Sequence, residues 1–264
     1  MRSEVYNIEP SNIYCADCLD IMPKIADKSV DCILCDLPFG TTKNHWDSII
    51  PLDKLWAQYE RIIKPDGAIV LFSQQPFTSQ LVMSNPKLFK YEWIWEKENG
   101  TGFLNANHAP LKIHENILVF GKGATSPTKK SVPMTYNPQK TKGKPYTAVQ
   151  GYTGNNYSHT VGNVTVSDGR RYPTDILRFQ RDKDKYHSTQ KPVELLRYLV
   201  LTYTNEGDTV LDNCMGSGST IVAAIKEKRQ YIGIEKDEHF FEIAKERIKN
   251  ETSQLSLFQQ TNYN

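Results

Sequence analysis

The sequence predicts an α/β fold in which helices separate the strands of a largely parallel sheet. Short apolar runs, the pattern of strands buried on both faces, alternate with segments whose apolar residues follow helical spacing. One apolar run leads through a glycine loop directly into a helical segment, and another stops at a carboxylate and a proline. The 264 residues are enough for one large domain, or for one domain with an inserted module.

The first half of the chain supplies five predicted strands, over residues 12–15, 30–35, 68–72, 91–96 and 115–120. Three helices are predicted over residues 19–25, 51–63 and 76–83. The helix over 51–63 has a clear signal, because Pro51 suits a first turn and the apolar residues recur every three or four positions. A polar loop is expected over 41–49, and a turn over 64–67, where a proline and a glycine stand close together.

The alternation returns near the C-terminus. Helices are predicted over residues 192–203, 219–228 and 238–249, and strands over 209–212 and 231–235. We therefore expect four parts: one half of the sheet over 1–120, an inserted basic region over 121–185, a second half of the sheet over 186–250, and a flexible polar tail over 251–264.

The inserted region breaks the strand and helix rhythm. Residues 121–170 are rich in Lys, Thr, Gly, Pro, Tyr, Ser and Asn, and they are too many for a simple connection in a compact domain. From residue 122 to 185 the chain has 12 basic and 4 acidic residues, whereas the remainder has 20 and 26. A basic segment on a mildly acidic body favours an anionic partner, although a solvated basic loop has the same composition.

The run over residues 30–40 is the candidate for an active site. A buried strand ends at Asp36, Pro38 cannot donate to a sheet, and Gly40 permits a sharp turn. Open α/β sheets bind ligands at the carboxyl ends of their strands. We therefore expect Asp36 and Phe39 to face a ligand.

Cysteine spacing raises the question of a metal site. Cys15 with Cys18, and Cys32 with Cys35, form two C-x-x-C pairs, a spacing that zinc sites use. Both pairs stand in strand-like apolar runs, where residues three apart point to opposite faces and cannot easily share one ion. We therefore expect buried, reduced structural cysteines and no metal.

The segment over residues 210–220 has the pattern of a strand, a glycine loop and a helix. Such a segment offers free backbone N–H groups to a nucleotide-type ligand. Glu235 ends the next strand, 17 residues after Gly218, where a carboxylate suits two ribose hydroxyls. Gly216 and Gly218 are followed by Ile221 instead of the third glycine of a dinucleotide fingerprint, which favours a nucleoside without a pyrophosphate.

Three motifs together resemble the amino-methylating DNA methyltransferases. They are Asp36-Leu37-Pro38-Phe39, His187-Ser188-Thr189-Gln190-Lys191-Pro192, and Asp212-Asn213-Cys214-Met215-Gly216-Ser217-Gly218-Ser219-Thr220. Their order resembles the permuted order of the β group of that family. The resemblance covers residues 12 to 248. It implies a Rossmann-like, seven-stranded methyltransferase sheet with an inserted target-recognition region, S-adenosylmethionine as cofactor, and double-stranded DNA as partner; a homodimer is left open.

The resemblance also implies cofactor-binding residues. It assigns this role to Asp17, Lys191, Asp212, Gly216, Gly218, Ser219, Thr220 and Glu235. Glu235 would hold the ribose, and Lys191 would sit near the methionine carboxylate. Two of these have ordinary alternatives, since Asp17 could cap the helix that follows it and Lys191 could be a surface lysine before a helix proline.

The catalytic residues implied by the resemblance are Asp36, Leu37, Pro38 and Phe39. Asp36 and the Leu37 carbonyl would accept the two N–H groups of an exocyclic amine, and Phe39 would stack on a base flipped out of the duplex. Leu37 replaces the usual Pro, and Phe39 the usual Tyr. In this family an acidic first residue is more typical of adenine N6 than of cytosine N4 targets, so adenine is expected; N4-cytosine methylation, and a DNA-binding module with a decayed catalytic motif, are the alternatives.

The basic region would contact the duplex. Its candidate residues are Lys129, Lys130, Lys140, Lys142, Lys144, Arg170 and Arg171. Tyrosines stand among them, namely Tyr136, Tyr146, Tyr152, Tyr157 and Tyr172. This mixture suits stacking on bases and neutralising phosphates.

The C-terminal tail carries a further motif. Gln254, Leu255, Ser256, Leu257 and Phe258 resemble the short peptide by which bacterial proteins bind the replicative sliding clamp. An exposed tail would offer three apolar anchors to a groove, although these side chains could instead fold onto the protein's own core.

The remaining sequence features predict a cytoplasmic protein. No apolar run approaches the roughly 20 residues that a membrane helix needs, and the first residues have no signal-peptide core.

Overall fold

The computed structural model describes residues 10–40, 49–126, 131–149, 151, 162–183, 186 and 190–261, with side chains as far as residue 253. The chain forms two compact units. One consists of Met1–Asn137 and Asp175–Asn264, and the other of Pro138–Thr174. The smaller unit is therefore shorter than the predicted region over 121–185. The flanking residues belong to the larger unit, where Met134 and Leu177 are buried in the core.

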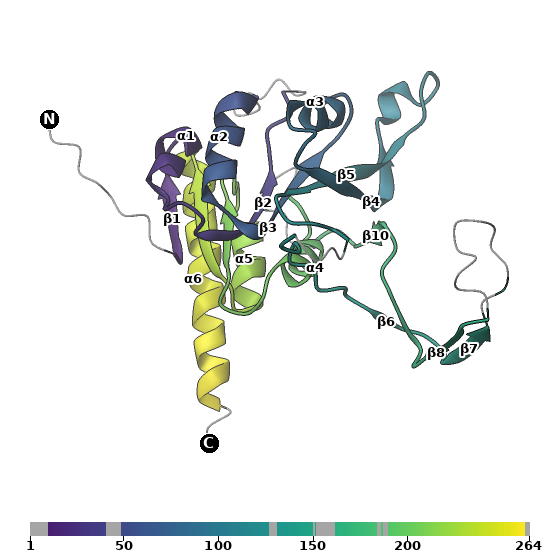
Figure 1. Cartoon of the computed structure of the whole chain (residues 1–264). Coiled ribbons are helices and arrows are strands. Elements are labelled where there is room, and N and C mark those ends of the chain that lie inside the picture. The colour runs from purple at the N-terminus through teal and green to yellow at the C-terminus, as the bar shows by residue number, and fades with distance from the viewer. Residues whose placement is uncertain are drawn as a thin grey trace, which may run out of the picture. The chain divides into compact units, whose positions relative to one another are not determined.

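The larger unit is built on an eight-stranded sheet in the order β1-β12-β11-β2-β3-β5-β4-β10 (Figure 1). The strands are β1 (Asn12–Cys15), β2 (Val30–Asp36), β3 (Ile63–Ser73), β4 (Phe89–Thr101), β5 (Lys112–Gly121), β10 (Ile176–Arg178), β11 (Thr209–Asp212) and β12 (Gln230–Glu235). The α/β, Rossmann-like class is thus confirmed. The sheet has eight strands instead of the expected seven, because the short strand β10 pairs with β4 at the edge.

The expectation of a parallel sheet is wrong for β5. This strand is antiparallel to both of its neighbours, β3 and β4, whereas the other pairings described in this sheet are parallel. A parallel connection needs a crossover, usually a helix, whereas an antiparallel pair can be joined by a hairpin. Between β4 and β5 the chain has only a short 3-10 helix, η2 (Phe103–Asn105), so the two strands form a hairpin.

Helices cover both faces of the sheet (Figure 1). They are α1 (Cys18–Ile21), the 3-10 helix η1 (Met22–Lys24), α2 (Leu52–Ile62), α3 (Phe77–Ser84), α4 (Val193–Tyr203), α5 (Ser219–Lys226) and α6 (Glu238–Thr261). Among the described helices, none combines the length and the apolar character that crossing a membrane requires.

Helix α6 is longer than predicted. It was expected to end at Lys249, with a flexible tail after it, but its backbone stays helical as far as Thr261. The segment over residues 254–258 therefore lies within a helix. Its side chains are outside the described part of the chain, so binding to a sliding clamp stays a prediction.

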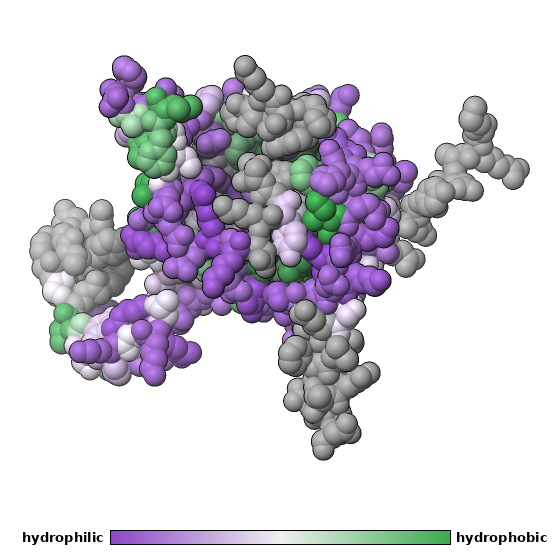
Figure 2. Space-filling model, turned by 180° about the vertical axis from the view of Figure 1, so that it is seen from behind, coloured by the Kyte–Doolittle hydropathy of each residue, from purple (hydrophilic) through white to green (hydrophobic). Residues whose placement is uncertain are grey.

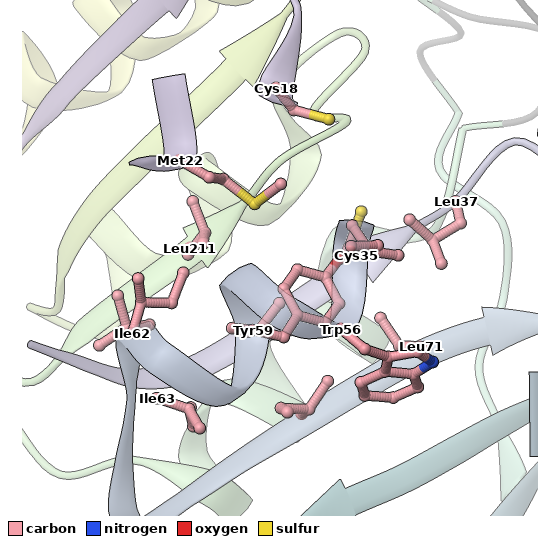
Figure 3. Close-up of a cluster of buried hydrophobic side chains, with 14 of the residues drawn as sticks. Cys18, Met22, Cys35, Leu37, Trp56, Tyr59, Ile62, Ile63, Leu71 and Leu211 are labelled. Atoms are coloured by element: carbon pink, nitrogen blue, oxygen red, sulfur yellow. The ribbon is translucent and has the colours of Figure 1, made fainter. Parts of the chain in front are cut away.

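Alternate residues of β2 enter two different cores. Ile33 and Cys35 face a cluster on the side of α2, where Tyr59 is fully buried (Figure 3). Cys32 and Leu34 face the other side of the sheet and pack in the cluster that contains the buried residues of α4. This strand is buried on both faces, as predicted. The expectation of buried cysteines fails at Cys15, which is exposed on the edge strand β1.

The predicted turn over 64–67 is an irregularity within β3. Val30 of β2 pairs with Ile63, but Cys32 pairs with Ala68, so the four residues 64–67 of β3 lie opposite Asp31 alone and β3 has three extra residues. A Cβ atom on Gly67 would lie 2.7 Å from the Asp31 carbonyl oxygen, which explains why this position needs glycine. The turn-forming residues thus mark a bulge instead of a chain reversal.

The smaller unit contains two antiparallel ribbons. One pairs β6 (Thr141–Lys142) with β9 (Arg170–Arg171), and the other pairs β7 (Tyr146–Val149) with β8 (Val164–Ser167). These strands escaped the sequence analysis because they have only two to four residues, too few to establish a periodic pattern.

Candidate active site

A cavity of about 310 Å³ lies at the carboxyl ends of β1, β2, β11 and β12. The chain passes from β2 to α2 on one face of the sheet, and from β11 to α5 on the opposite face, beside α4. Because β2 and β11 are neighbours, their connections diverge and leave a crevice between them, the usual ligand site of open α/β sheets. The sheet topology thus joins two motifs that are nearly two hundred residues apart.

The predicted catalytic residues line this cavity. Asp36 is the last residue of β2, Leu37 is buried, and Pro38 and Phe39 are half-buried. The Phe39 ring lies 5.4 Å from that of Phe77 on α3. The Oδ1 atom of Asp36 is buried and has no hydrogen-bond partner among the described residues. One carboxylate oxygen is therefore left to accept a hydrogen bond.

The other carboxylate oxygen of Asp36 accepts a hydrogen bond from Lys191. The same ammonium lies 3.4 Å from Glu115 Oε2, and Glu115 in turn accepts from Lys97. Lys191 is only 8% exposed, and Glu115 and Lys97 are each 12% exposed. The four side chains form a row of alternating charge, which we call the charged row. Lys191 is thus not a surface lysine; it contacts the carboxylate of Asp36, the predicted catalytic residue.

The charged row perturbs its own protonation equilibria. Burial raises the pKa of Asp36; Lys191 opposes this shift, and the negative charge of Glu115 adds to it. Burial would lower the pKa of Lys191, but the carboxylates of Asp36 and Glu115 outweigh it and raise that pKa. Lys191 is therefore cationic at neutral pH, and its charge is shared between two carboxylates.

Glu115 and Lys97 were missed by the sequence analysis. Glu115 stood at the start of a predicted apolar strand, just as Asp36 stood at the end of one, and that similarity was the available signal. The antiparallel direction of β5 brings its beginning to the same edge of the sheet as the end of β2. Lys97 follows on β4, where Trp95 pairs with Glu115.

The segment before α4 is anchored by Asp182. Gln190 donates to Asp182 Oδ2 at 2.8 Å, and the backbone N–H of Val193 donates to the same carboxylate at 3.2 Å. These contacts fix the chain on both sides of Lys191. Residues 187–189 of the same motif lie outside the described residues.

The glycine loop is held by Glu235, as its predicted position at the end of β12 allows. Glu235 Oε2 accepts from the backbone of Gly216, and its Oε1 from the backbone of Asp237, both at 2.8 Å. Gly218 has φ +80°, and a Cβ atom there would lie 3.0 Å from Ala244 of α6. Next to Gly216 the corresponding space is open. The loop therefore packs on α6 at one glycine and leaves room for a ligand at the other.

Asp212, Ser219 and Thr220 also line the cavity. Asp212 is 3% exposed, and burial raises its pKa to about 6, against hydrogen bonds from Thr220 and from the Cys214 backbone. The Ser219 hydroxyl accepts from Arg247 at 3.1 Å. These hydroxyls thus contact other parts of the protein and help to fix the shape of the loop, and their predicted contact with the cofactor stays a prediction.

Asp17 caps α1, since its Oδ1 accepts from the backbone of Leu19 at 2.9 Å. It also lines the cavity. Asp17 therefore both caps α1 and lies at its predicted position beside the ligand cavity. Tyr59 was missed by the sequence analysis: its hydroxyl donates to Asn213 Oδ1 at 2.5 Å beneath the loop.

The predicted DNA-binding residues over 140–171 come together in the smaller unit. Lys142 pairs with Arg170 across β6 and β9, and Arg171 donates to the Lys144 carbonyl at 2.6 Å. Rings lie beneath two of the cations, with Lys140 4.1 Å from the Tyr172 ring centre and Arg171 4.7 Å from that of Tyr146. Tyr136, by contrast, belongs to the larger unit, beside Tyr203. Lys129, Lys130, Tyr152 and Tyr157 lie outside the described residues.

Comparison with protein families matches residues 30–246 to the N6/N4 methylase family, described as DNA methylase. The chain is 26% identical to the type II methyltransferase M.HpaI of Haemophilus parainfluenzae, over 90% of this chain and 74% of that protein. It is 27% identical to the DNA adenine methyltransferase YhdJ of Escherichia coli K12, over 91% of this chain and 83% of that protein.

Solved structures of similar fold include the M1.HpyAVI–SAM complex, with a TM-score of 0.60, 24% identity, and coverage of 89% of this chain and 98% of that one. The cytosine-N4-specific PvuII DNA methyltransferase has a TM-score of 0.63 at 14% identity, over 92% of this chain and 88% of that one. At these identities the likeness concerns the fold. The family match spans most of the sheet and both halves of the cavity, and the chain therefore belongs to the N6/N4 DNA methylase family.

Proposed function

We propose that this protein transfers a methyl group from S-adenosylmethionine to the exocyclic N6 of an adenine flipped out of double-stranded DNA. One observation carries the proposal. Among the described residues, a buried oxygen atom of Asp36 has no hydrogen-bond partner, and it lies in a cavity that also contains the glycine loop. An unsatisfied buried acceptor is costly, and an amine that donates to it would satisfy it.

The cavity fits the cofactor on two counts. The Glu235 carboxylate has remaining lone pairs for ribose hydroxyls after accepting two backbone N–H groups. The space beside Gly216 is open, so the backbone there can approach a ligand closely. When bound, S-adenosylmethionine supplies an electrophilic methyl group on a sulfonium. Glu235, Asp212 and the loop over 214–218 would hold it.

The chemistry requires the amine to be held in one orientation. An exocyclic amine is a weak nucleophile because its lone pair is delocalised into the ring. Asp36 Oδ1 would accept one N–H and the Leu37 carbonyl the other, which favours a pyramidal nitrogen whose lone pair is no longer delocalised into the ring. After the methyl group has moved to the nitrogen, Asp36 Oδ1 would take the proton that the nitrogen loses. Lys191 favours the ionised form of Asp36, against the effect of burial, and fixes the carboxylate through its other oxygen. Phe39, packed on Phe77, would offer a face on which the base stacks.

Two observations favour adenine as the target base. The acidic residue at the start of the catalytic motif favours adenine. A relative that matches over most of both chains is named a DNA adenine methyltransferase. The PvuII enzyme of similar fold is specific for cytosine N4. N4-cytosine is therefore the alternative product, and the charged row on Asp36 argues against a decayed catalytic motif.

A methyl-transfer assay tests the proposal. Purified protein with labelled S-adenosylmethionine should label duplex DNA, and digestion to nucleosides should release N6-methyl-2′-deoxyadenosine. Asp36→Ala should lower the rate by about 10³-fold, the range for a positioned acid–base group, with cofactor affinity unchanged. Full activity of this variant would contradict the proposal. Sequencing of DNA from cells that make the protein would give the modified base and its sequence context.

A further inference from the structure

The hairpin that joins β4 and β5 ends in an apolar tip. Leu104 is 100% exposed and Phe103 is 69% exposed, and Leu111 and Ile113 beside them are exposed as well. Scattered apolar residues on a surface are ordinary, but a cluster of large exposed ones marks a contact site. Figure 2 shows this tip as a green projection at the upper left.

The tip has its own hydrogen-bonded framework. The N–H of Asn105 donates to the Gly102 carbonyl at 3.0 Å, and that of His108 donates to the Asn105 carbonyl at 2.9 Å. At the base of the tip Thr101 pairs with Lys112 in the β4–β5 ladder. The apolar side chains are therefore presented by a built turn on a two-stranded ribbon.

The hairpin stands at the catalytic edge of the sheet. β4 and β3 both run antiparallel to β5, so the carboxyl end of β4 lies at the same edge as those of β2 and β3. In Figure 1 the hairpin extends beyond the end of the sheet at which α1 follows β1. Glu115 lines the cavity, and Lys112 stands three positions before it, roughly 10 Å along the strand.

The composition of the hairpin suits a nucleic acid. Residues 99–114 contain Lys112, His108 and His114, three asparagines, and neither Asp nor Glu. The tip thus carries no carboxylate of its own to repel a phosphate, and exposed Glu98 precedes it on β4. A two-stranded β-ribbon is also one of the elements that the major groove of DNA admits.

We infer that Phe103 and Leu104 form a wedge that enters the base stack and occupies the space left by the target base. The inference rests on the proposed function, because it requires a duplex whose base reaches Asp36. A base cannot reach such a pocket without leaving the helix. Proteins that open duplexes insert side chains such as Phe and Leu between base steps. Leu104, the fully exposed residue, would penetrate furthest.

The test compares two duplexes that contain the recognition sequence. One has the target base paired, and the other has it opposite an abasic position, so that flipping no longer breaks a pair. The variant F103A/L104A should methylate the paired duplex about 10-fold more slowly than the wild-type protein does. On the unpaired duplex its rate should stay within about twofold of the wild-type rate. Val132→Ala, which alters an exposed apolar residue outside the hairpin, should leave both rates unchanged.

A second readout needs no methyl transfer. With 2-aminopurine at the target position, binding of the wild-type protein should increase the fluorescence of the 2-aminopurine. Binding of F103A/L104A should give only a small part of that increase. Equal loss of rate on both duplexes, or an unchanged rate and fluorescence on the paired one, would overturn the wedge. A change from dimer to monomer on sedimentation would also overturn it, in favour of a contact between copies.

Failure of the proposed function looks different. If the wild-type protein methylated neither duplex, the proposed reaction would be wrong. The fluorescence comparison would still decide whether the hairpin tip displaces a base from the stack, because it measures binding alone.

Discussion

The two sides of the active-site cavity are held in place by different kinds of interaction. On the cofactor side, backbone N–H groups of the glycine loop and of the turn after β12 donate to Glu235. On the catalytic side, Asp36 is held by the charged row, in which Lys191, Glu115 and Lys97 come from three separate parts of the chain. The first side is fixed by hydrogen bonds to the backbone, and the second by coupled charges.

This difference has a consequence for mutagenesis. A change on the cofactor side should alter ligand affinity, because it alters the shape of a loop. A change in the charged row should alter the protonation of Asp36, because each charge there shifts the pKa of its neighbours. The pH dependence of the reaction therefore distinguishes the two sides.

Lys191→Met should have the largest effect. It leaves Asp36 and Glu115 buried without the cation between them, which should cost about 3 kcal/mol of unfolding free energy. The pKa of Asp36, already raised by burial, should rise further, so the acidic limb of the kcat profile should move to higher pH. Urea unfolding and kcat measured from pH 5 to 9 check both effects.

The matched control for this substitution is Lys228→Met, which breaks the exposed pair with Glu206. Exposed pairs contribute little, so stability should change by less than about 1 kcal/mol and the pH profile should stay in place. A Lys191→Met variant with an unmoved acidic limb would show that Lys191 does not set the protonation of Asp36.

Glu235→Ala should have the next largest effect, confined to the cofactor side. Loss of the carboxylate removes both backbone contacts that hold the glycine loop, so S-adenosylmethionine affinity should fall by about 10- to 100-fold, or about 1.4 to 2.8 kcal/mol. Calorimetric titration measures this directly. DNA affinity and the position of the acidic limb should not change, and a shifted limb would contradict the separation between the two sides.

Glu115→Gln should give a smaller effect of opposite sign to that of Lys191→Met. The negative charge of Glu115 helps to raise the pKa of Asp36, so its removal should lower that pKa and move the acidic limb to lower pH. Gln keeps an oxygen for Lys97. Glu92→Gln on β4, whose carboxylate bonds to Asn116, is the control and should leave the limb unchanged. If Lys191→Met and Glu115→Gln moved the acidic limb of the kcat profile in the same direction, the charges of Lys191 and Glu115 would not shift the pKa of Asp36 in opposite directions, and the expectation would be wrong.

Lys142→Gln in the smaller unit should have the smallest effect. If Lys142 neutralises one phosphate, the slope of log K against log salt for DNA binding should become shallower by about one, and kcat at saturating DNA should not change. Lys249→Gln, on the exposed surface of α6, is the control and should leave the slope unchanged. An unaltered slope for Lys142→Gln would remove this residue from the DNA-contacting surface.

The same contrast explains which site residues the sequence revealed. Asp212, Gly216 and Gly218 stand in one short segment, and Glu235 ends the next strand, so local patterns were enough to find them. Asp36 was found because a buried strand ends there. Glu115 stood at the start of an apolar strand, but neither it nor Lys97 could be assigned to the site, since their approach to Asp36 depends on the antiparallel direction of β5 and on its pairing with β4.

In the smaller unit, too, strand pairing decides which residues come together. Composition marked residues 122–185 as basic, but only the pairing of β6 with β9 brings Lys142 beside Arg170, 28 residues further along the chain. The unit boundaries at Pro138 and Thr174 also depended on packing, because the basic composition extends beyond them on both sides.

The sequence by itself determined the α/β class, the two motifs of the cavity and the family to which they belong. These features are recorded in periodicity and short spacings, which a single chain segment satisfies on its own. The tertiary structure decided the direction of β5, the length of α6, the partner of Lys191 and the exposure of the hairpin tip. The direction of β5 and the partner of Lys191 depend on contacts between residues far apart in the chain, and no local pattern specifies which distant charge or strand a residue will meet.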